Sequence, residues 1–310
     1  MGSIIFGGKS LYHLKTKAAS FTIQPTNGGQ WLALKLGSPL DGKEMSIVAG
    51  HKPADPFFAS GSFLMFPWVN RLDPNPWARE PFYPSKHWLT DGNGISLHGL
   101  YHNLPRVLKE ESISQSDSFV SFSFLLPPEW KDTVIGKMLV TESFYLTDHE
   151  LKVCYEVKNT SDSEFLFALG IHPYFCLGGE NTIDDLYLFG SGFSEVKLGD
   201  FLLPEKIEKE SVRFASEIKL EGLNLDNLYK SNVEDVSKSY FGFFSMNRRE
   251  RVIVGGGSFY QVYTPLDRKS IAIEPMTATG NFLQFEREYA LHLGPGETKK
   301  VEFFIRIETF

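Results

Sequence analysis

Glu274 is a carboxylate at the end of an apolar run, Ile271-Ala272-Ile273, and Pro275 follows it directly. Proline has no N–H for a sheet ladder, so we expect regular pairing to stop here and Glu274 to lie at a strand end. Apolar surroundings disfavour the charged carboxylate, which raises its pKa and makes it a better general base. Glu274 could therefore accept a proton from a substrate hydroxyl. A structural salt bridge, for example to Arg71, is the alternative role.

His172 is the matching candidate for a general acid. It precedes Pro173 in the segment Gly170-Ile171-His172-Pro173-Tyr174-Phe175. A residue before proline is restricted to extended backbone, which orients the imidazole, and the aromatic neighbours suit a pocket wall. Imidazole titrates close to neutral pH, so His172 can donate a proton to a substrate oxygen. An ordinary histidine at a strand end is the alternative.

Polar groups that could hold a substrate occur in two further segments. Asn70 and Arg71 follow the aromatic stretch Phe66-Pro67-Trp68, and the N–H groups of Arg71 could hold hydroxyls or a carboxylate. Asp226 lies in a polar break, Asn224–Tyr229, that is also compatible with a simple turn. Each segment alone is a weak signal for binding.

His98 is followed by Gly99, whose missing Cβ would let a ligand or another backbone come close. His98 and His102 have the helical spacing of some metal-ligand pairs, but the nearby glycines and Pro105 disfavour a helix. We therefore do not expect a metal site here.

These segments must be positioned by strands, because hydrophobic residues alternate with polar ones along much of the chain. Clear period-two runs cover 118–124, 151–157 and 301–307, and a further strand is expected at 259–264. Helical patterns are limited to short candidates at Asn227–Ser231 and Asn232–Lys238. Many strands with few short helices predict an all-β sandwich or barrel. We expect a single domain over residues 1–310.

The composition of the chain limits the classes of molecule that it is expected to bind. The chain has 31 basic and 38 acidic residues, a net charge of −7, so its field would repel nucleic acid and anionic membranes. A small neutral ligand fits better. Two cysteines are too few for a disulfide framework, and no signal-length apolar segment forms at the start, so we expect a cytoplasmic protein. A monomer or weak dimer is the default expectation.

Taken together and in order, the segments resemble the aldose 1-epimerase (galactose mutarotase-like) family. The resemblance spans nearly the whole chain and is carried by Asn70-Arg71-Leu72, His98-Gly99, His172-Pro173-Tyr174-Phe175, Asp226 and Glu274-Pro275. Gln261-Val262-Tyr263-Thr264 and Leu293-Gly294-Pro295-Gly296-Glu297 are also similar to family patterns.

The resemblance implies a large antiparallel β-sandwich, the galactose mutarotase-like supersandwich, with a site for an aldohexose on one face and neither a metal nor a nucleotide cofactor. It implies that Glu274 takes the proton of the anomeric hydroxyl while His172 protonates the ring oxygen. The ring then opens to the free aldehyde and closes again after rotation about the C1–C2 bond. The residues expected to bind the substrate are Arg71, His98, Asp226, Asn70 and Tyr174.

The chain departs from the family pattern at three neighbours of these residues. Leu100 replaces a second glycine, Ile171 replaces an asparagine, and Met276 replaces a glutamine. We expect such changes to affect the choice of sugar more than the type of reaction, because a lost amide contact alters which hydroxyl is satisfied.

Three other functions stay open on the sequence. A hexose-6-phosphate mutarotase of the same fold would need a cationic cluster, for which the candidates are Arg79, Arg106, Arg248, Arg249 and Arg251. A carbohydrate-binding protein without turnover would use stacking aromatics such as Trp68, Tyr174 and Phe282. A metal-dependent sugar isomerase or cupin-like enzyme is disfavoured, because the histidines are scattered without ligand spacing.

Overall fold

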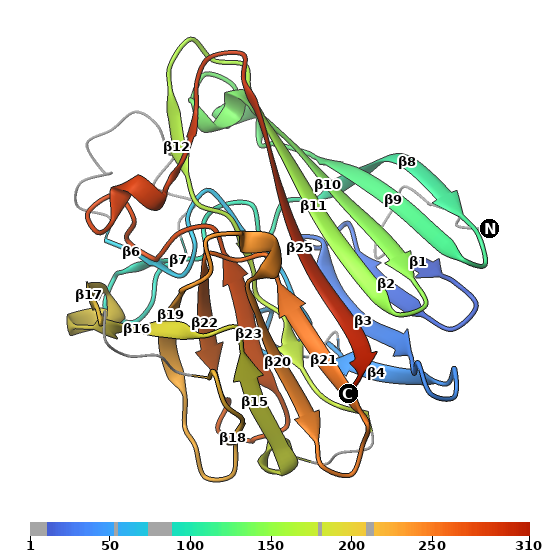
Figure 1. Ribbon diagram of the computed structural model, residues 1–310. Coiled ribbons are helices and arrows are strands. Elements are labelled where there is room, and N and C mark those ends of the chain that lie inside the picture. Colours follow the sequence, from blue (N-terminus) through green and yellow to red (C-terminus); the bar gives the residue numbers. More distant parts are fainter. Residues whose placement is uncertain (1–10, 53–54, 74–88, 179–181, 209–213) are drawn as a thin grey trace.

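The computed structural model is built from antiparallel strands (Figure 1), and it describes residues 11–52, 55–73, 89–178, 182–208 and 214–310. The helical segments in these ranges are 3-10 turns of three residues each: η2 (Pro128–Trp130), η3 (Ile135–Lys137), η4 (Ile183–Asp185), η5 (Asp200–Leu202), η6 (Val236–Lys238) and η7 (Arg287–Tyr289). No helix in the described ranges is long and apolar enough to cross a membrane. The predicted all-β fold with few short helices is confirmed.

The larger sheet has twelve strands and carries Tyr174, Asp226 and Glu274. In chain order these are β1 (Tyr12–Lys15), β2 (Ser20–Gln24), β3 (Gln30–Gly37), β4 (Glu44–Val48), β5 (Leu64–Met65), β13 (Gly170–Ile171), β14 (Tyr174–Phe175), β16 (Phe193–Leu198), β17 (Pro204–Ile207), β19 (Asp226–Ser231), β22 (Phe259–Tyr263) and β23 (Ile271–Met276). The main path runs β1-β2-β3-β4-β14-β23-β22-β19-β16-β17, and β13 pairs with both β23 and β5.

The second sheet has nine strands in the order β18-β15-β20-β21-β25-β11-β10-β9-β8. In chain order they are β8 (Arg106–Ile113), β9 (Asp117–Phe124), β10 (Met138–Thr147), β11 (Glu150–Asn159), β15 (Leu186–Gly190), β18 (Ile218–Lys219), β20 (Tyr240–Ser245), β21 (Glu250–Gly255) and β25 (Thr298–Thr309). Two short pairs complete the fold, β6 (Arg71–Leu72) with β7 (Ser96–Leu97) and β12 (Phe165–Phe167) with β24 (Leu291–Leu293).

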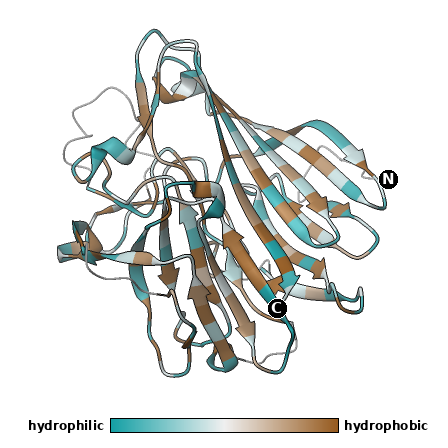
Figure 2. Cartoon of the chain, in the orientation of Figure 1, coloured by the Kyte–Doolittle hydropathy of each residue, from teal (hydrophilic) through white to brown (hydrophobic). Residues whose placement is uncertain are grey.

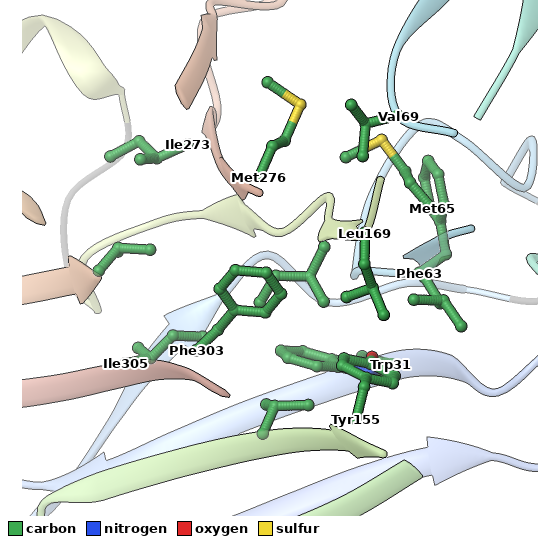
Figure 3. Close-up of a cluster of buried hydrophobic side chains, with 14 of the residues drawn as sticks. Trp31, Phe63, Met65, Val69, Tyr155, Leu169, Ile273, Met276, Phe303 and Ile305 are labelled. Atoms are coloured by element: carbon green, nitrogen blue, oxygen red, sulfur yellow. The ribbon is translucent and has the colours of Figure 1, made fainter. Parts of the chain in front are cut away.

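The expected period-two patterns lie on strands β9, β11 and β25, and the further strand expected at 259–264 is β22. Along β25, Phe303, Ile305 and Ile307 are buried, and hydrophobic and hydrophilic residues alternate along the long strands (Figure 2). One continuous core receives side chains from both sheets, with Ile273 from the larger and Ile305 from the smaller (Figure 3). Full burial of such a side chain contributes roughly 1.5–3 kcal/mol, so the two inner faces hold the sheets together.

Neither helix expected between residues 227 and 238 forms as predicted. Asn227–Ser231 lies in β19, which pairs with β16 on one side and β22 on the other, and only Val236–Lys238 forms a helical turn. A helix of five residues closes too few hydrogen bonds to compete with a strand paired on both sides.

Pro275 does not end its strand, so that prediction was wrong. Strand β23 continues to Met276, which pairs with Phe259 and Gly170. On the edge toward β13 and β14, Ile273 N donates to Pro173 O and Thr277 N donates to Leu169 O, so the missing N–H of Pro275 falls between them. At that point the neighbouring chain is itself interrupted between β13 and β14, and no ladder partner is lost.

Gly99 brings two segments into close contact beneath His98. Its φ is +75°, and a Cβ added to it would lie 2.1 Å from Phe66 O. Phe66 and Gly99 form an isolated bridge, and Leu100 N donates to the same carbonyl. The close approach expected at this glycine is therefore made by backbone.

We expect Gly99→Ala to lower the free energy of unfolding by about 3 kcal/mol, because both the positive φ and the contact with Phe66 O oppose a side chain. Gly94→Ala is the matched control, since Gly94 has φ +81° but no atom within 4 Å of an added Cβ. It should cost about 1 kcal/mol. Urea unfolding measures both values, and equal losses would show that the contact with Phe66 adds nothing.

Candidate active site

A pocket of about 220 Å³ gathers all seven residues that the sequence nominates for chemistry or binding. Its described lining is Asn70, Arg71, Leu97, His98, His172, Tyr174, Asp226, Gln261, Tyr263 and Glu274. The nominated residues span 205 positions of the chain, from 70 to 274, so only the fold brings them together.

Size alone would point elsewhere, because three other hollows in the described surface have volumes of about 470, 730 and 920 Å³. The two largest are lined mainly by exposed or half-buried side chains of strand edges and turns. The small pocket instead combines a carboxylate and an imidazole that are each more than nine-tenths buried. Convergent buried titratable groups are the stronger indicator of an active site.

Strand register places one half of the pocket on a single face of the larger sheet. Glu274 in β23 is directly opposite Gln261 in β22, and Asp226 in β19 is opposite Tyr263 in β22. Residues that are opposite or two apart along a strand share a face. Tyr174 is opposite Ala272 and so lies on the same face as Glu274.

The other half of the pocket comes from the β6–β7 pair, where Arg71 is opposite Leu97. Asn70 and His98 flank this pair and have left-handed backbone, with φ values of 47° and 58°. His98 N donates to Asn70 O over 2.8 Å, which links the two segments. Non-glycine residues with positive φ are uncommon and cluster at sites where surrounding structure holds them.

The central contact joins His172 Nε2 to Glu274 Oε1 at 3.1 Å. His172 lies in the interruption between β13 and β14, and its N–H donates to Phe63 O. Its ring stacks on Phe63 at a centroid distance of 4.8 Å and on Tyr174 at 5.0 Å. Glu274 therefore pairs with His172, and the predicted alternative of a salt bridge to Arg71 is wrong.

Burial sets the titration of this pair. It lowers the pKa of His172 from 6.5 to about 3, and it raises the pKa of Glu274 well above its ordinary value, with a further increase from the nearby Asp226 charge. Arg71 acts in the opposite direction on Glu274 but is the weakest of these influences. Each charge is disfavoured alone, so we expect the pair to hold one proton in total between the lowered pKa of His172 and the raised pKa of Glu274.

A chain of hydrogen bonds runs from Arg71 to Asp226 through two amides. Arg71 Nη1 contacts Asn70 Oδ1 at 3.3 Å, Asn70 Nδ2 donates to Gln261 Oε1 at 3.1 Å, and Gln261 Nε2 donates to Asp226 Oδ1 at 2.6 Å. Arg71 Nε also lies 3.6 Å from Asp91 Oδ2. The chain holds the Asp226 carboxylate, an otherwise exposed group, in a fixed orientation at the pocket.

Gln261, Tyr263 and Asp91 were not nominated from the sequence as site residues. Gln261 carried a usable signal, because it is an amide inside the apolar, aromatic run Phe259–Tyr263, where a buried polar group needs a partner. Asp91 gave no such signal, since it lies in a turn.

Tyr174 lines the pocket with its ring. Its hydroxyl donates to Phe58 O at 2.7 Å, so that hydrogen is already used. Trp68 and Phe282, the other aromatics considered as stacking faces, are each 1% exposed and belong to the core, so they present no surface to a sugar.

The three departures from the family pattern lie in the core. Leu100, Ile171 and Met276 are at most 2% exposed, and none is among the described lining residues. Packing rather than contact with a ligand explains these side chains.

The arginines considered for a phosphate are engaged away from the pocket. Arg106 pairs with Glu142, Arg248 bonds to Gly178 O, and Arg251 pairs with Glu308. Arg249 is exposed and does not line the pocket, and Arg79 lies outside the described residues. Arg71 is the cationic side chain of the described lining. The described ranges also hold no group of three or more His, Cys, Asp or Glu residues arranged to bind a metal ion.

Comparison with known proteins gives one family. The model of the family described as aldose 1-epimerase matches residues 10–305. A search of curated proteins finds no match.

Solved structures with the same fold include a galactose mutarotase-like protein from Clostridium acetobutylicum, with 17% identity, a TM-score of 0.78 and coverage of 100% of this chain and 98% of that one. They also include an aldose epimerase homologue from C. elegans, with 18% identity, a TM-score of 0.73 and coverage of 97% and 99%. The predicted galactose mutarotase-like sandwich is thus confirmed.

We expect Glu274→Gln to stabilise the protein at neutral and alkaline pH. The raised pKa means that the folded state binds a proton more tightly than the unfolded state, so this contribution is present below the unfolded value of 4.5 and is lost as pH rises through the folded pKa. The amide avoids that loss, and its advantage should increase from pH 4.5 upward and reach about 1–2 kcal/mol.

Urea unfolding across pH measures this difference. Glu142→Gln is the control with the opposite sign, because Glu142 pairs with the buried Arg106 at 3.2 Å. This substitution leaves the buried Arg106 without its charged partner, which should lower the free energy of unfolding by about 3–5 kcal/mol. A Glu274→Gln variant that is less stable than wild type at pH 8 would contradict the argument from burial.

Proposed function

Since the chain belongs to the aldose 1-epimerase family, we propose that it is a mutarotase that interconverts the α and β anomers of a free aldohexose. The observation that carries the proposal is the contact of 3.1 Å between Glu274 and His172 in a pocket lined by hydroxyl-binding groups. The anomeric hydroxyl and the ring oxygen are bonded to one carbon, so a base and an acid that serve both must line the same small pocket.

Glu274 acts as the base and His172 as the acid. The carboxylate takes the proton of the anomeric hydroxyl, the electron pair of that O–H bond forms the aldehyde C=O, and the C1–O5 bond breaks. The ring oxygen takes the proton of the imidazolium as it leaves. Rotation about C1–C2 exposes the other face of the aldehyde, and the reverse transfers close the ring and restore both groups.

Ring opening leaves the total charge of the buried Glu274–His172 pair unchanged. Before ring opening the pair is carboxylate and imidazolium, and afterwards it is carboxylic acid and imidazole. The two forms carry the same single proton and the same total charge, so the site needs neither a net charge change nor exchange with solvent. The opposite pKa shifts of Glu274 and His172 stabilise the neutral form relative to the ion pair, and this is the distribution of protons that ring opening produces.

The remaining pocket groups hold the sugar hydroxyls. Arg71 supplies donors, and Asp226, oriented through Gln261, supplies acceptors. His98 lies beside His172, with ring centroids 5.2 Å apart, and so faces a hydroxyl near the reacting carbon. The ring of Tyr174 and the amide of Asn70 complete the contacts.

Two alternatives have less support. A hexose-6-phosphate mutarotase needs several cations around the phosphate, whereas Arg248 and Arg251 are engaged elsewhere. A sugar-binding protein without turnover would have no need to bury a carboxylate against an imidazole at a cost in stability.

Glu274→Gln and His172→Gln should each lower the rate of mutarotation by at least about 100-fold, because each removes one of the two proton carriers. Polarimetry on fresh α-glucose, α-galactose and their 6-phosphates, corrected for the spontaneous rate, measures this. Glu302→Gln, a half-exposed carboxylate on β25 paired with Lys300, is the control and should stay within about twofold of wild type. Wild type that binds sugars without exceeding the spontaneous rate would indicate a binding protein.

The pH profile of kcat/KM should have an acidic limb set by His172 and a basic limb set by Glu274. The pair gains a second proton only near the lowered His172 pKa of about 3, and it loses its one proton only at the raised pKa of Glu274. The acidic limb therefore lies well below 6.5, the ordinary value for histidine. A limb with an apparent pKa close to that ordinary value would show that His172 titrates as an exposed imidazole.

A further inference from the structure

Met65 contacts the ring of His98 through its sulfur. Met65 is the last residue of β5 and is fully buried. Its Sδ lies 3.2 Å from His98 Nδ1. The mechanism proposed above does not use this contact, and the sequence alone gives no reason to place Met65 at the site.

The chemistry of the two atoms makes the contact directional. A thioether sulfur has no hydrogen and can only accept a hydrogen bond. The contact is attractive when Nδ1 carries the ring hydrogen and repulsive when Nδ1 carries its lone pair. Neutral imidazole has one ring hydrogen, so a hydrogen on Nδ1 leaves Nε2 as an acceptor.

His98 is held neutral, so only one of its two ring nitrogens carries a hydrogen. Burial lowers its pKa well below the ordinary value, and the neighbouring His172, His102 and Arg71 lower it further. Because Nδ1 is occupied by Met65, Nε2 is the nitrogen left for the pocket that His98 lines.

We propose that Met65 is a positioning residue that fixes the tautomer of His98, so that Nε2 accepts a hydrogen bond from a sugar hydroxyl. The identity of the ligand as a sugar rests on the proposed function, whereas the assignment of the His98 tautomer does not. The proposal also predicts selectivity among sugars. Nε2 accepts a hydrogen bond from a hydroxyl at this position, and a deoxy or O-methyl sugar has no hydroxyl hydrogen there to donate.

Met276 offers a matched control for simple packing. Both methionines are fully buried, and their side chains lie in the same cluster (Figure 3). Both also approach Gly170, where an added Cβ would lie 2.8 Å from Met276 Cγ and 3.0 Å from Met65 Cε. If Met65 only filled space, leucine would replace it as readily as it replaces Met276.

Long-range proton–nitrogen NMR on the uniformly 15N-labelled full chain reads the tautomer, because protonated and bare ring nitrogens differ widely in 15N shift. The His98 signals are assigned by their loss in His98→Asn. We expect a protonated Nδ1 in wild type and Met276→Leu, and a shift toward protonated Nε2 in Met65→Leu. The wild-type spectrum decides the matter even if Met65→Leu does not fold.

Kinetics on the preferred sugar then test the consequence. Met65→Leu should raise KM about fivefold with little change in kcat, the effect of one lost hydrogen bond, while Met276→Leu keeps both. A wild-type His98 protonated at Nε2, or equal behaviour of the two leucine variants, would overturn the proposal. Absence of turnover in wild type would instead overturn the mutarotase proposal, and the NMR result would still decide the tautomer.

Discussion

The contact between the Glu274 carboxylate and the His172 imidazole depends on an interruption in the larger sheet. The chain between β13 and β14 leaves the ladder for His172 and Pro173, and the neighbouring β23 has Pro275 at the same level. A residue without an N–H on one strand thus meets a gap in the other. The imidazole sits in that gap, stacked between Phe63 and Tyr174, with Glu274 in reach.

This arrangement is costly for the fold. Glu274 Oε2 and His172 Nδ1 have no hydrogen-bond partner among the described residues, although both atoms are buried. Buried polar atoms without partners oppose folding, and the large shared core of the two sheets offsets that cost. Each of these two atoms therefore keeps an unused hydrogen-bonding position.

The β6–β7 side of the pocket is held in place by tertiary contacts of the backbone. Asn70 and His98 occupy left-handed backbone, Gly99 packs against Phe66 O, and Met65 contacts His98 from below. These are short segments held by tertiary contacts, whereas Glu274, Gln261 and Asp226 are held by strand register. A rigid sheet therefore carries the carboxylates, and a set of close backbone contacts carries the donors and His98.

The all-β architecture and most of the residues that line the pocket could be predicted from sequence patterns. Alternation in β9, β11 and β25 is a local property of strands with one buried face, and ordered segments such as Asn70-Arg71 and His172-Pro173 identified the members of the pocket. Prediction from the sequence failed at 227–231 and at Pro275, because both depend on what the neighbouring strands do. The contact partner of each side chain became known only from the tertiary structure. Glu274 pairs with His172 instead of Arg71. The other pairs are Asp91 with Arg71, Gln261 with Asp226 and Met65 with His98. The physical reason is that a side chain's pKa, tautomer and hydrogen bonds are set by atoms within a few ångströms, and here those atoms come from distant parts of the chain.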